Sequence, residues 1–216
     1  MLLMKDIPVL YDNSEILVVN KPFGIAVHGG EGITITIIDI LERQTGIKIY
    51  PVHRLDKDTA GILVVAKSSR AAADYSRHIA DGLLVKEYKA VCYGRPAQPK
   101  GVVTLPAGRC GNEKPAETSW ELDAEANGYT LMSLRLGTGR MHQIRIHLAS
   151  IGCPILADDK YGDFQMNKKV RSENKIRKLQ LAACSLTLPV DDSEKRFTIP
   201  LPDHMQECLS SLGISQ

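Results

Sequence analysis

The stretch YPVHRLDKDTAG, residues 50–61, places two carboxylates and several basic or aromatic side chains between two extended segments. Pro51 disfavours helix for the residue before it, Tyr50. The run that follows, Ile62–Ala66, is short, apolar and β-branched, which is typical of a buried strand. Gly61 permits a tight return of the chain, and the polar residues before it suit a turn. The pattern therefore predicts a fixed loop that leads into a buried strand.

The two aspartates of this loop allow several interpretations. The simplest is a polar β-turn in which Asp56 and Asp58 hydrogen-bond nearby backbone groups. A calcium loop would need a glutamate at its twelfth position, where the sequence has Lys67. A dehalogenase-type phosphatase would need one residue between Asp58 and Thr59, which are adjacent. A single nucleophilic or basic carboxylate at Asp56 remains, with Arg54 available to hold it ionised or to contact substrate.

The run from His53 to Gly61, with Ala60 where serine is usual, resembles the signature of the RluA-type pseudouridine synthases. These enzymes isomerise uridine in structured RNA, and the resemblance places their catalytic aspartate at Asp56. The likeness continues over most of the chain, from about residue 16 to residue 200. Two further motifs, residues 85–94 and 137–148, are similar to the family's second and third motifs.

The resemblance also assigns roles to single residues. Tyr88 matches a tyrosine that stacks on the target uracil and takes part in proton transfer, and Leu181 matches an apolar residue beside the flipped base. Arg145 matches the arginine that pairs with the catalytic aspartate. The target uridine must leave its stack, and we expect the planar guanidinium of Arg54 to fill the vacancy.

The implied reaction breaks the N-glycosidic bond, rotates the uracil and rejoins it to the ribose through its fifth ring carbon. Such a rearrangement needs no metal, nucleotide or redox cofactor. In agreement, the sequence has no dinucleotide-binding fingerprint and no phosphate-binding GxxxxGK[ST] motif. A glycoside hydrolase is an alternative, but it needs a second acid across the pocket, and Asp58 is too close to Asp56 in sequence. A non-catalytic RNA-binding protein on the same scaffold is disfavoured because Asp56, Tyr88 and Arg145 are all present.

Composition indicates an ordinary globular protein: 216 residues, 44% hydrophobic and 5% aromatic. Lys5 and Asp6 precede any run of signal-peptide length, and no apolar run approaches about 18 residues. We therefore expect a cytoplasmic protein that does not enter membranes. The odd number of cysteines, without metal-type spacing, predicts buried thiols and neither zinc nor a disulfide. We expect one catalytic domain over residues 1–216, without a separate amino-terminal RNA-binding domain.

Local patterns predict an α+β fold: a mixed, largely antiparallel sheet with flanking helices and a central cleft that contains Asp56. Strands are expected at residues 16–22, 62–66, 85–94, 118–122 and 129–136 and twice within 179–199, and helices at 34–44, 68–82, 140–151 and 204–212. Asn127-Gly128 is a hairpin signal. Residues 95–114, rich in proline and glycine, are expected to form an irregular connection that contacts RNA.

The expected partner is RNA, with no membrane and no obligatory protein partner. The net charge of +2 does not itself indicate nucleic-acid binding. A basic cluster formed by Lys168, Lys169, Arg171, Lys175, Arg177 and Lys178 could neutralise phosphates, or it could be a solvated helix face or loop. Ribosomal RNA is favoured because His28-Gly29-Gly30 resembles the ribosomal members of the family. Transfer RNA remains open.

Overall fold

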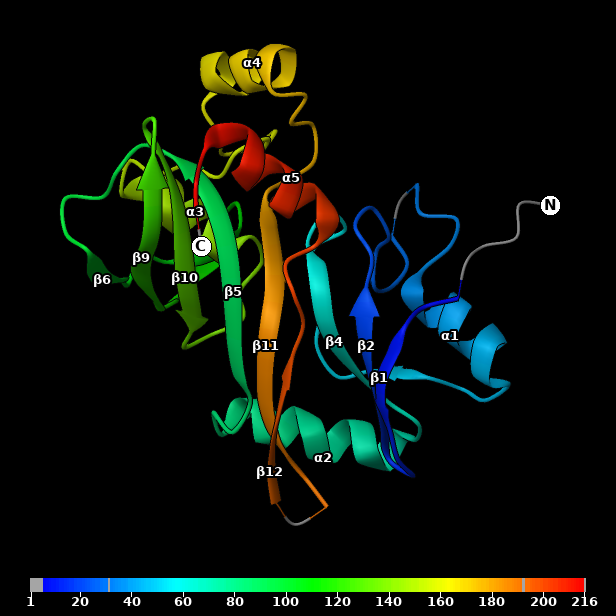
Figure 1. Cartoon of the computed structure of the whole chain (residues 1–216). Helices are drawn as coiled ribbons and strands as arrows, with labels where there is room; N and C mark the ends of the chain where they lie inside the picture. Colours follow the sequence, from blue (N-terminus) through cyan, green and yellow to red (C-terminus); the bar gives the residue numbers. More distant parts are fainter. Residues whose placement is uncertain (1–5, 31, 192, 216) are drawn as a thin grey trace. The chain divides into compact units, whose positions relative to one another are not determined.

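The computed structural model describes residues 6–30, 32–191 and 193–215. Its elements run in the following order (Figure 1): β1 Val9–Asp12, β2 Ile16–Lys21, α1 Ile37–Thr45, β3 Tyr50–Pro51, β4 Ala60–Ala66, α2 Ser69–Ala80, β5 Val85–Tyr93, β6 Lys100–Val103, β7 Ala107–Arg109, β8 Asn112–Lys114, β9 Thr118–Ala126, β10 Tyr129–Leu136, α3 Gln143–Ser150, α4 Phe164–Glu173, β11 Leu181–Val190, β12 Ser193–Thr198 and α5 Asp203–Leu212. The α+β class and the mixed, mostly antiparallel sheet are confirmed.

Contacts divide the described residues into two compact units. The first contains residues 6–85 and 183–199, and the second contains residues 86–182 and 200–215. The expectation of one catalytic domain stays a prediction.

The first unit is built on strands β1, β2, β4 and β11, with β12 paired to β11 and β3 paired to β4. Alternate residues of β2 and β4, such as Ile16, Val18, Ile62 and Val64, enter one apolar cluster because successive side chains of a strand point to opposite faces. Tyr75 of α2 packs into the same cluster. This packing confirms the predicted strands at residues 16–22 and 62–66.

Helix ends in the first unit follow from local capping. Thr36 and Asp39 form a capping box at the start of α1, with the Asp39 N–H donating to Thr36 Oγ1 at 3.1 Å and the Thr36 N–H donating to Asp39 Oδ2 at 2.8 Å. This box starts α1 three residues later than predicted, and the helix buries Ile37, Ile40 and Leu41. Ser68 caps α2, which lies within the helix predicted at residues 68–82.

The second unit contains the strand order β5, β10, β9, β6 and a separate pair of β7 with β8. Asn127 and Gly128 have φ angles of 54° and 81°, the left-handed conformation that a tight hairpin between β9 and β10 requires. Two expectations are wrong here. Residues 95–114 include the short strands β6, β7 and β8. The predicted helix at 140–151 begins only at Gln143, because His142 has a φ of 55° and lies outside helical geometry.

The cysteines and surface agree only in part with expectation. All five cysteines are free thiols, and Cys92, Cys153 and Cys208 are buried. Cys110 is exposed and Cys184 is only half-buried, so the prediction of buried thiols is wrong for Cys110 and holds only in part for Cys184. Within the described ranges, no helix is long and apolar enough to cross a membrane. Over the same residues, the His, Cys, Asp and Glu side chains form no group of three that could hold a metal ion.

Candidate active site

The loop that carries Asp56 is held at both ends within the first unit. The Thr59 N–H donates to the Asp56 carbonyl oxygen at 3.1 Å and closes a β-turn. Before the turn, Leu55 is buried, and His53 Nε2 accepts a hydrogen bond from the Val64 N–H of β4 at 3.1 Å. The Asp56 side chain is half-buried. These contacts confirm the predicted fixed loop that leads into a buried strand.

A buried lysine lies beside this loop. Lys21, the last residue of β2, has no exposed surface. Its Nζ donates to the carbonyl oxygens of Pro22 at 2.9 Å and Lys57 at 3.0 Å. Burial lowers the pKa of Lys21 to about 8, and the negative charges of Asp58 and Asp56 oppose this shift. A positive charge is therefore built into the base of the Asp56 loop.

Lys21 was missed by the sequence reasoning. The available signal was a lysine within the otherwise apolar run Ile16–Lys21, directly before Pro22. A charge at a position that the strand pattern buries requires partners. Those partners are backbone carbonyl oxygens, and any residue can supply one, so the sequence does not indicate where they are.

Gly61 allows the strands at the base of the loop to approach closely. It lies opposite Lys21 in the pairing of β2 with β4. A Cβ atom at Gly61 would come within 2.2 Å of the Ala183 carbonyl oxygen on β11, and the φ of 117° is one that other residues rarely adopt. Glycine is therefore required where the Asp56 loop enters β4.

Arg54 lies on the exposed side of the same loop, next to the segment that follows β2. Its Nη1 is 3.5 Å from Nε2 of His28. Because a guanidinium can only donate, His28 Nε2 is the acceptor in this contact. His28, part of the His28-Gly29-Gly30 stretch that resembles the ribosomal members, thus lies beside the arginine expected to contact RNA.

The other predicted site residues lie in the second unit. Tyr88 is buried on β5 and faces Leu134 of β10 in the strand pairing. Leu181 is buried at the start of β11. Arg145 is buried on α3. All three side chains are buried, and their roles toward substrate stay predictions.

Arg145 forms a buried bidentate ion pair. Its Nε and Nη2 donate to Asp158 Oδ2 and Oδ1, each at 2.7 Å, and Nη2 also donates to Asp159 Oδ1 at 3.2 Å. Burial favours the protonated form of Asp158, but the Arg145 hydrogen bond and the N–H groups of Tyr161 and Lys160 outweigh it and hold the pKa of Asp158 below its usual range. The Arg145 guanidinium also lies 5.3 Å from the centre of the Tyr161 ring.

Asp158 was likewise missed. The resemblance implies that Arg145 pairs with the catalytic aspartate, Asp56, and this pairing stays a prediction. The hydrogen bonds described above join Arg145 to a different aspartate, Asp158. The usable signal was the spacing of Asp158, Tyr161 and Gly162 in a short polar turn. Gly162 has no space for a side chain, since a Cβ would lie 2.3 Å from the Asp158 carbonyl oxygen.

A buried polar chain fixes the start of α3. Gln143 Nε2 donates to Thr118 Oγ1 at 2.9 Å, and Thr118 Oγ1 is 2.9 Å from His147 Nδ1. His147 Nε2 is 2.7 Å from the Leu105 carbonyl oxygen, which can only accept. His147 therefore donates from Nε2 and accepts at Nδ1 from the Thr118 hydroxyl. This chain ties α3, and with it Arg145, to β9 and to the segment before β7.

Comparison with known proteins decides the family. The model of the RNA pseudouridylate synthase family matches residues 15–150, more than half of the chain. This chain belongs to the RNA pseudouridylate synthase family. It is an RNA pseudouridine synthase of the RluA type, as the signature at residues 53–61 indicated.

Named relatives of the synthase span nearly its whole length. Ribosomal large subunit pseudouridine synthase C of Escherichia coli (strain K12) is 34% identical over 222 residues, which cover 94% of this chain and 69% of the relative. Synthase D of Buchnera aphidicola subsp. Acyrthosiphon pisum is 31% identical and covers 96% of this chain and 76% of the relative. The structure of human RNA pseudouridylate synthase domain containing 4 aligns with a TM-score of 0.84 at 26% identity, covering 97% of this synthase and 94% of that chain.

Proposed function

We propose that this synthase converts uridine to pseudouridine in large-subunit ribosomal RNA, with Asp56 as the nucleophile. The observation that carries the assignment of Asp56 is its loop, which is anchored by Leu55, His53 and Thr59 and underlain by the Lys21 ammonium. The names of the synthase C and D relatives support the ribosomal substrate. We expect the enzyme to act in the cytoplasm, on RNA and without a cofactor.

The reaction rearranges bonds without net oxidation or reduction. The glycosidic bond to N1 of uracil breaks, the ring turns, and a bond forms between the ribose and C5. The C5 hydrogen leaves as a proton and N1 gains one. Asp56 supplies the nucleophile that makes bond cleavage reversible within the pocket. Tyr88 stacks on the uracil and takes part in the proton transfer, beside the apolar Leu181.

The two arginines have different proposed tasks. Arg145 orients the Asp56 carboxylate, and its own position is fixed by the bidentate pair with Asp158. Arg54 is exposed and therefore accessible to RNA. Extruding a base costs a few kcal/mol, and the planar guanidinium of Arg54 offsets part of that cost by occupying the vacated position in the stack.

The decisive experiment replaces Asp56 with asparagine. Asp56→Asn keeps the size and most of the hydrogen-bonding capacity of the side chain but removes its charge and nucleophilicity, so pseudouridine formation is expected to be abolished while RNA affinity is retained. Pseudouridine is measured by chemical tagging of RNA, alongside RNA binding and a thermal melt. Asp58→Asn is the matched control, and near-normal turnover is expected. Wild-type turnover in a folded Asp56→Asn variant would remove Asp56 from catalysis.

The RNA target is tested separately. Total RNA from cells with and without this protein is tagged and mapped, and the ribosomal proposal predicts a pseudouridine in large-subunit ribosomal RNA that disappears with the protein. A change confined to transfer RNA would contradict the ribosomal proposal and leave the enzyme class intact.

A further inference from the structure

The positive charge of this protein is concentrated in one segment of the second unit. Residues 164–178, which comprise α4 and the turn after it, contain six lysines and arginines and one acid, Glu173, a net charge of +5. The whole chain has a net charge of +2, so all other residues together carry −3. A net charge of +5 within 15 residues is therefore far more than an even distribution of charge along the chain would give.

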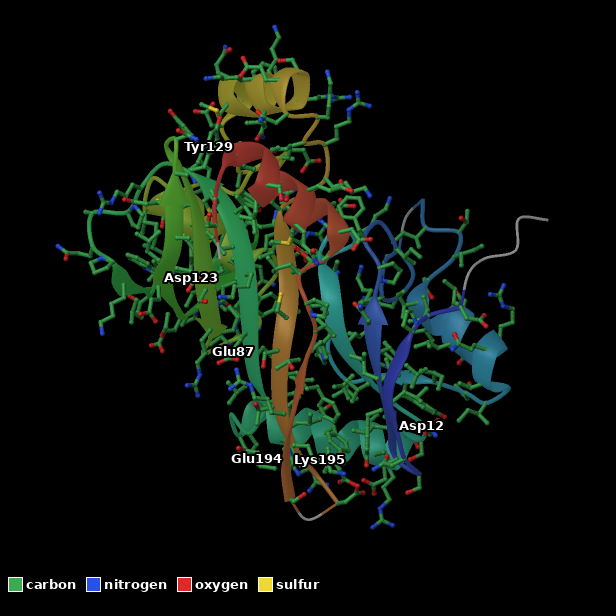
Figure 2. The ribbon with its side chains drawn as sticks, viewed as in Figure 1. Asp12, Glu87, Asp123, Tyr129, Glu194 and Lys195 are labelled. Carbon is green, nitrogen blue, oxygen red and sulfur yellow. The ribbon has the colours of Figure 1, made fainter. Side chains whose placement is uncertain are left out.

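Helix α4 has an inner and an outer face. Val170 is fully buried, and Met166 Sδ accepts a hydrogen bond at 3.4 Å from Tyr129, which Figure 2 labels below the helix. Phe164, Lys168 and Arg171 follow one another at i, i+4 and i+7, a spacing that keeps them within about 60° of one another around a helix. They lie opposite Met166 and Val170 and form the outer face.

Residues other than these three explain why α4 folds where it does. Asp163 caps the helix by accepting from the Met166 N–H at 2.7 Å. Asn167 Nδ2 donates to the Asp158 carbonyl oxygen at 2.8 Å and ties the helix to the turn that holds Arg145. Lys175 Nζ donates to the Ser172 carbonyl oxygen at 2.8 Å and so satisfies the end of the helix. The aromatic ring and the charges of the outer face require another explanation.

Phe164 is the most unusual member of the outer face. It is 77% exposed, more than any other large hydrophobic side chain in the described part of the chain. A helix that lies on a membrane places several large apolar residues on its outer face, whereas this one has a single aromatic among cations. A single exposed ring flanked by cations is instead the arrangement that binds an unpaired base next to its phosphates.

We propose that the outer face of α4 docks a structured RNA at a point where a duplex meets an unpaired nucleotide. Lys168 and Arg171 neutralise phosphates of the duplex, with Lys169 beside them, and Phe164 stacks on the unpaired base. This proposal rests on the proposed function, since it assumes an RNA substrate, and it adds a second contact surface on α4 that holds RNA without taking part in the chemistry.

The proposed phosphate contacts are tested by measuring how the double variant Lys168→Gln/Arg171→Gln binds a fully paired RNA duplex. Loss of two phosphate contacts should reduce the slope of log Kd against log salt concentration by about 1.8. Arg70→Gln is the matched control, because Arg70 is also a helical arginine, with a side chain 95% exposed on α2 of the first unit. An unchanged slope in the double variant, or an equal change with Arg70→Gln, would overturn the phosphate contacts.

The proposed stacking of Phe164 is tested by comparing the binding of two RNA hairpins that differ only by one bulged nucleotide. Phe164→Ala should weaken binding of the bulged hairpin by between about fivefold and 150-fold and leave the fully paired hairpin unchanged. Phe164→Trp should restore binding because it keeps an aromatic surface. Equal effects on both hairpins would overturn the stacking role.

The rate of pseudouridine formation distinguishes a failure of the α4 docking proposal from a failure of the proposed enzymatic function. At saturating RNA concentration the α4 variants should form pseudouridine at the wild-type rate. If the wild-type protein itself formed no pseudouridine in ribosomal RNA, the proposed function would fail while the binding measurements would still report on α4. Binding of an acidic protein, with no loss of RNA affinity in any α4 variant, would overturn the docking proposal itself.

Discussion

Lys21 is a fully buried charge that the protein keeps despite its cost. Burial lowers its pKa from 10.5 to about 8, which means that the folded state favours the neutral amine relative to the unfolded chain. The two carbonyl oxygens that it binds, of Pro22 and Lys57, belong to the strand end and to the Asp56 loop. Lys21 therefore joins these two segments.

The free-energy cost of burying the Lys21 ammonium predicts how the stability of the protein changes at alkaline pH. A lysine whose folded pKa lies below its unfolded pKa contributes stability that rises between pH 8 and 10.5, since the unfolded chain binds more protons in that window. The shift corresponds to about 3 kcal/mol. Urea unfolding at pH 7.5 and 10.5 should show this rise in the wild type relative to Lys21→Met, and the comparison cancels groups common to both proteins. Parallel pH dependences would contradict the burial cost.

The residues of the site could be predicted only where the motif is local in sequence. Arg54 and Asp56 lie within one contiguous signature, so the sequence alone could propose them as site residues. Lys21 binds the carbonyl of Lys57, which is 36 residues away, and Arg145 binds Asp158 across 13 residues. The sequence carries only weak signals of these contacts, a lysine at the end of an apolar run and a short polar turn, and neither signal identifies the partner. Both contacts therefore became visible only in the folded chain.

Among the elements, β4 has the strictest geometric requirement. Its entry point, Gly61, combines a φ of 117° with contact to the backbone of β11. Both constraints act at the end of the strand that receives the Asp56 loop. A change there displaces the strand, the loop or both.

Gly61→Ala is expected to destabilise the protein by about 2–5 kcal/mol, because an added Cβ meets the Ala183 backbone and the conformation is strained. Gly24→Ala is the matched control: Gly24 also has a positive φ, 84°, but a Cβ there would meet nothing within 4 Å. Denaturant unfolding of the two variants should therefore differ, with the control losing only about 1–2 kcal/mol. Equal losses would show that backbone strain, and not the contact with Ala183, determines the effect.

Elements with strong capping signals were predicted well. Helix α2 lies within the predicted range 68–82 and is capped by Ser68, and Asn127-Gly128 located the hairpin between β9 and β10. The start of α3 was misplaced because the positive φ of His142 depends on contacts of the folded chain. Strands β7 and β8 have three residues each, which is too short for a pattern to be detected.

At the scale of the whole molecule, the fold class followed from the motif and from the alternating strand patterns. The division of the chain into two compact units could not be predicted from the motif or the strand patterns. Residues 183–199 join the first unit although they lie between the two segments of the second unit in sequence. Composition changes little along the chain, so no boundary could be read from it.

Acid stability depends on the ion pair of Arg145 with Asp158. The folded pKa of Asp158 is depressed, so its contribution to stability is present above about pH 4, the unfolded value, and is lost as pH falls through the folded pKa. Asp158→Asn should destabilise the protein by about 3–5 kcal/mol at pH 7, since it leaves a buried guanidinium uncompensated. Thermal melts from pH 7 to pH 2 should show the difference from wild type shrinking below pH 4.

Asp159→Asn is the control for that series. Asp159 also contacts Arg145, at 3.2 Å, but its side chain is 91% exposed. Its removal is expected to change stability by less than about 1 kcal/mol at every pH. A loss as large as that of Asp158→Asn would show that net charge near Arg145, rather than the buried bidentate geometry, determines acid stability.

The exposed thiol of Cys110, between β7 and β8, makes this protein a natural candidate for site-directed fluorescence. Burial raises the pKa of Cys92 and Cys153, and that of Cys208 to about 12, which suppresses the thiolate form that reacts with maleimides. The remaining cysteine, Cys184, is half-buried. A maleimide dye should therefore attach first to Cys110, whose thiol is exposed, without any engineered cysteine. The label would lie within residues 95–114, which we expect to contact RNA, so its brightness and rotational freedom should change in real time as RNA binds.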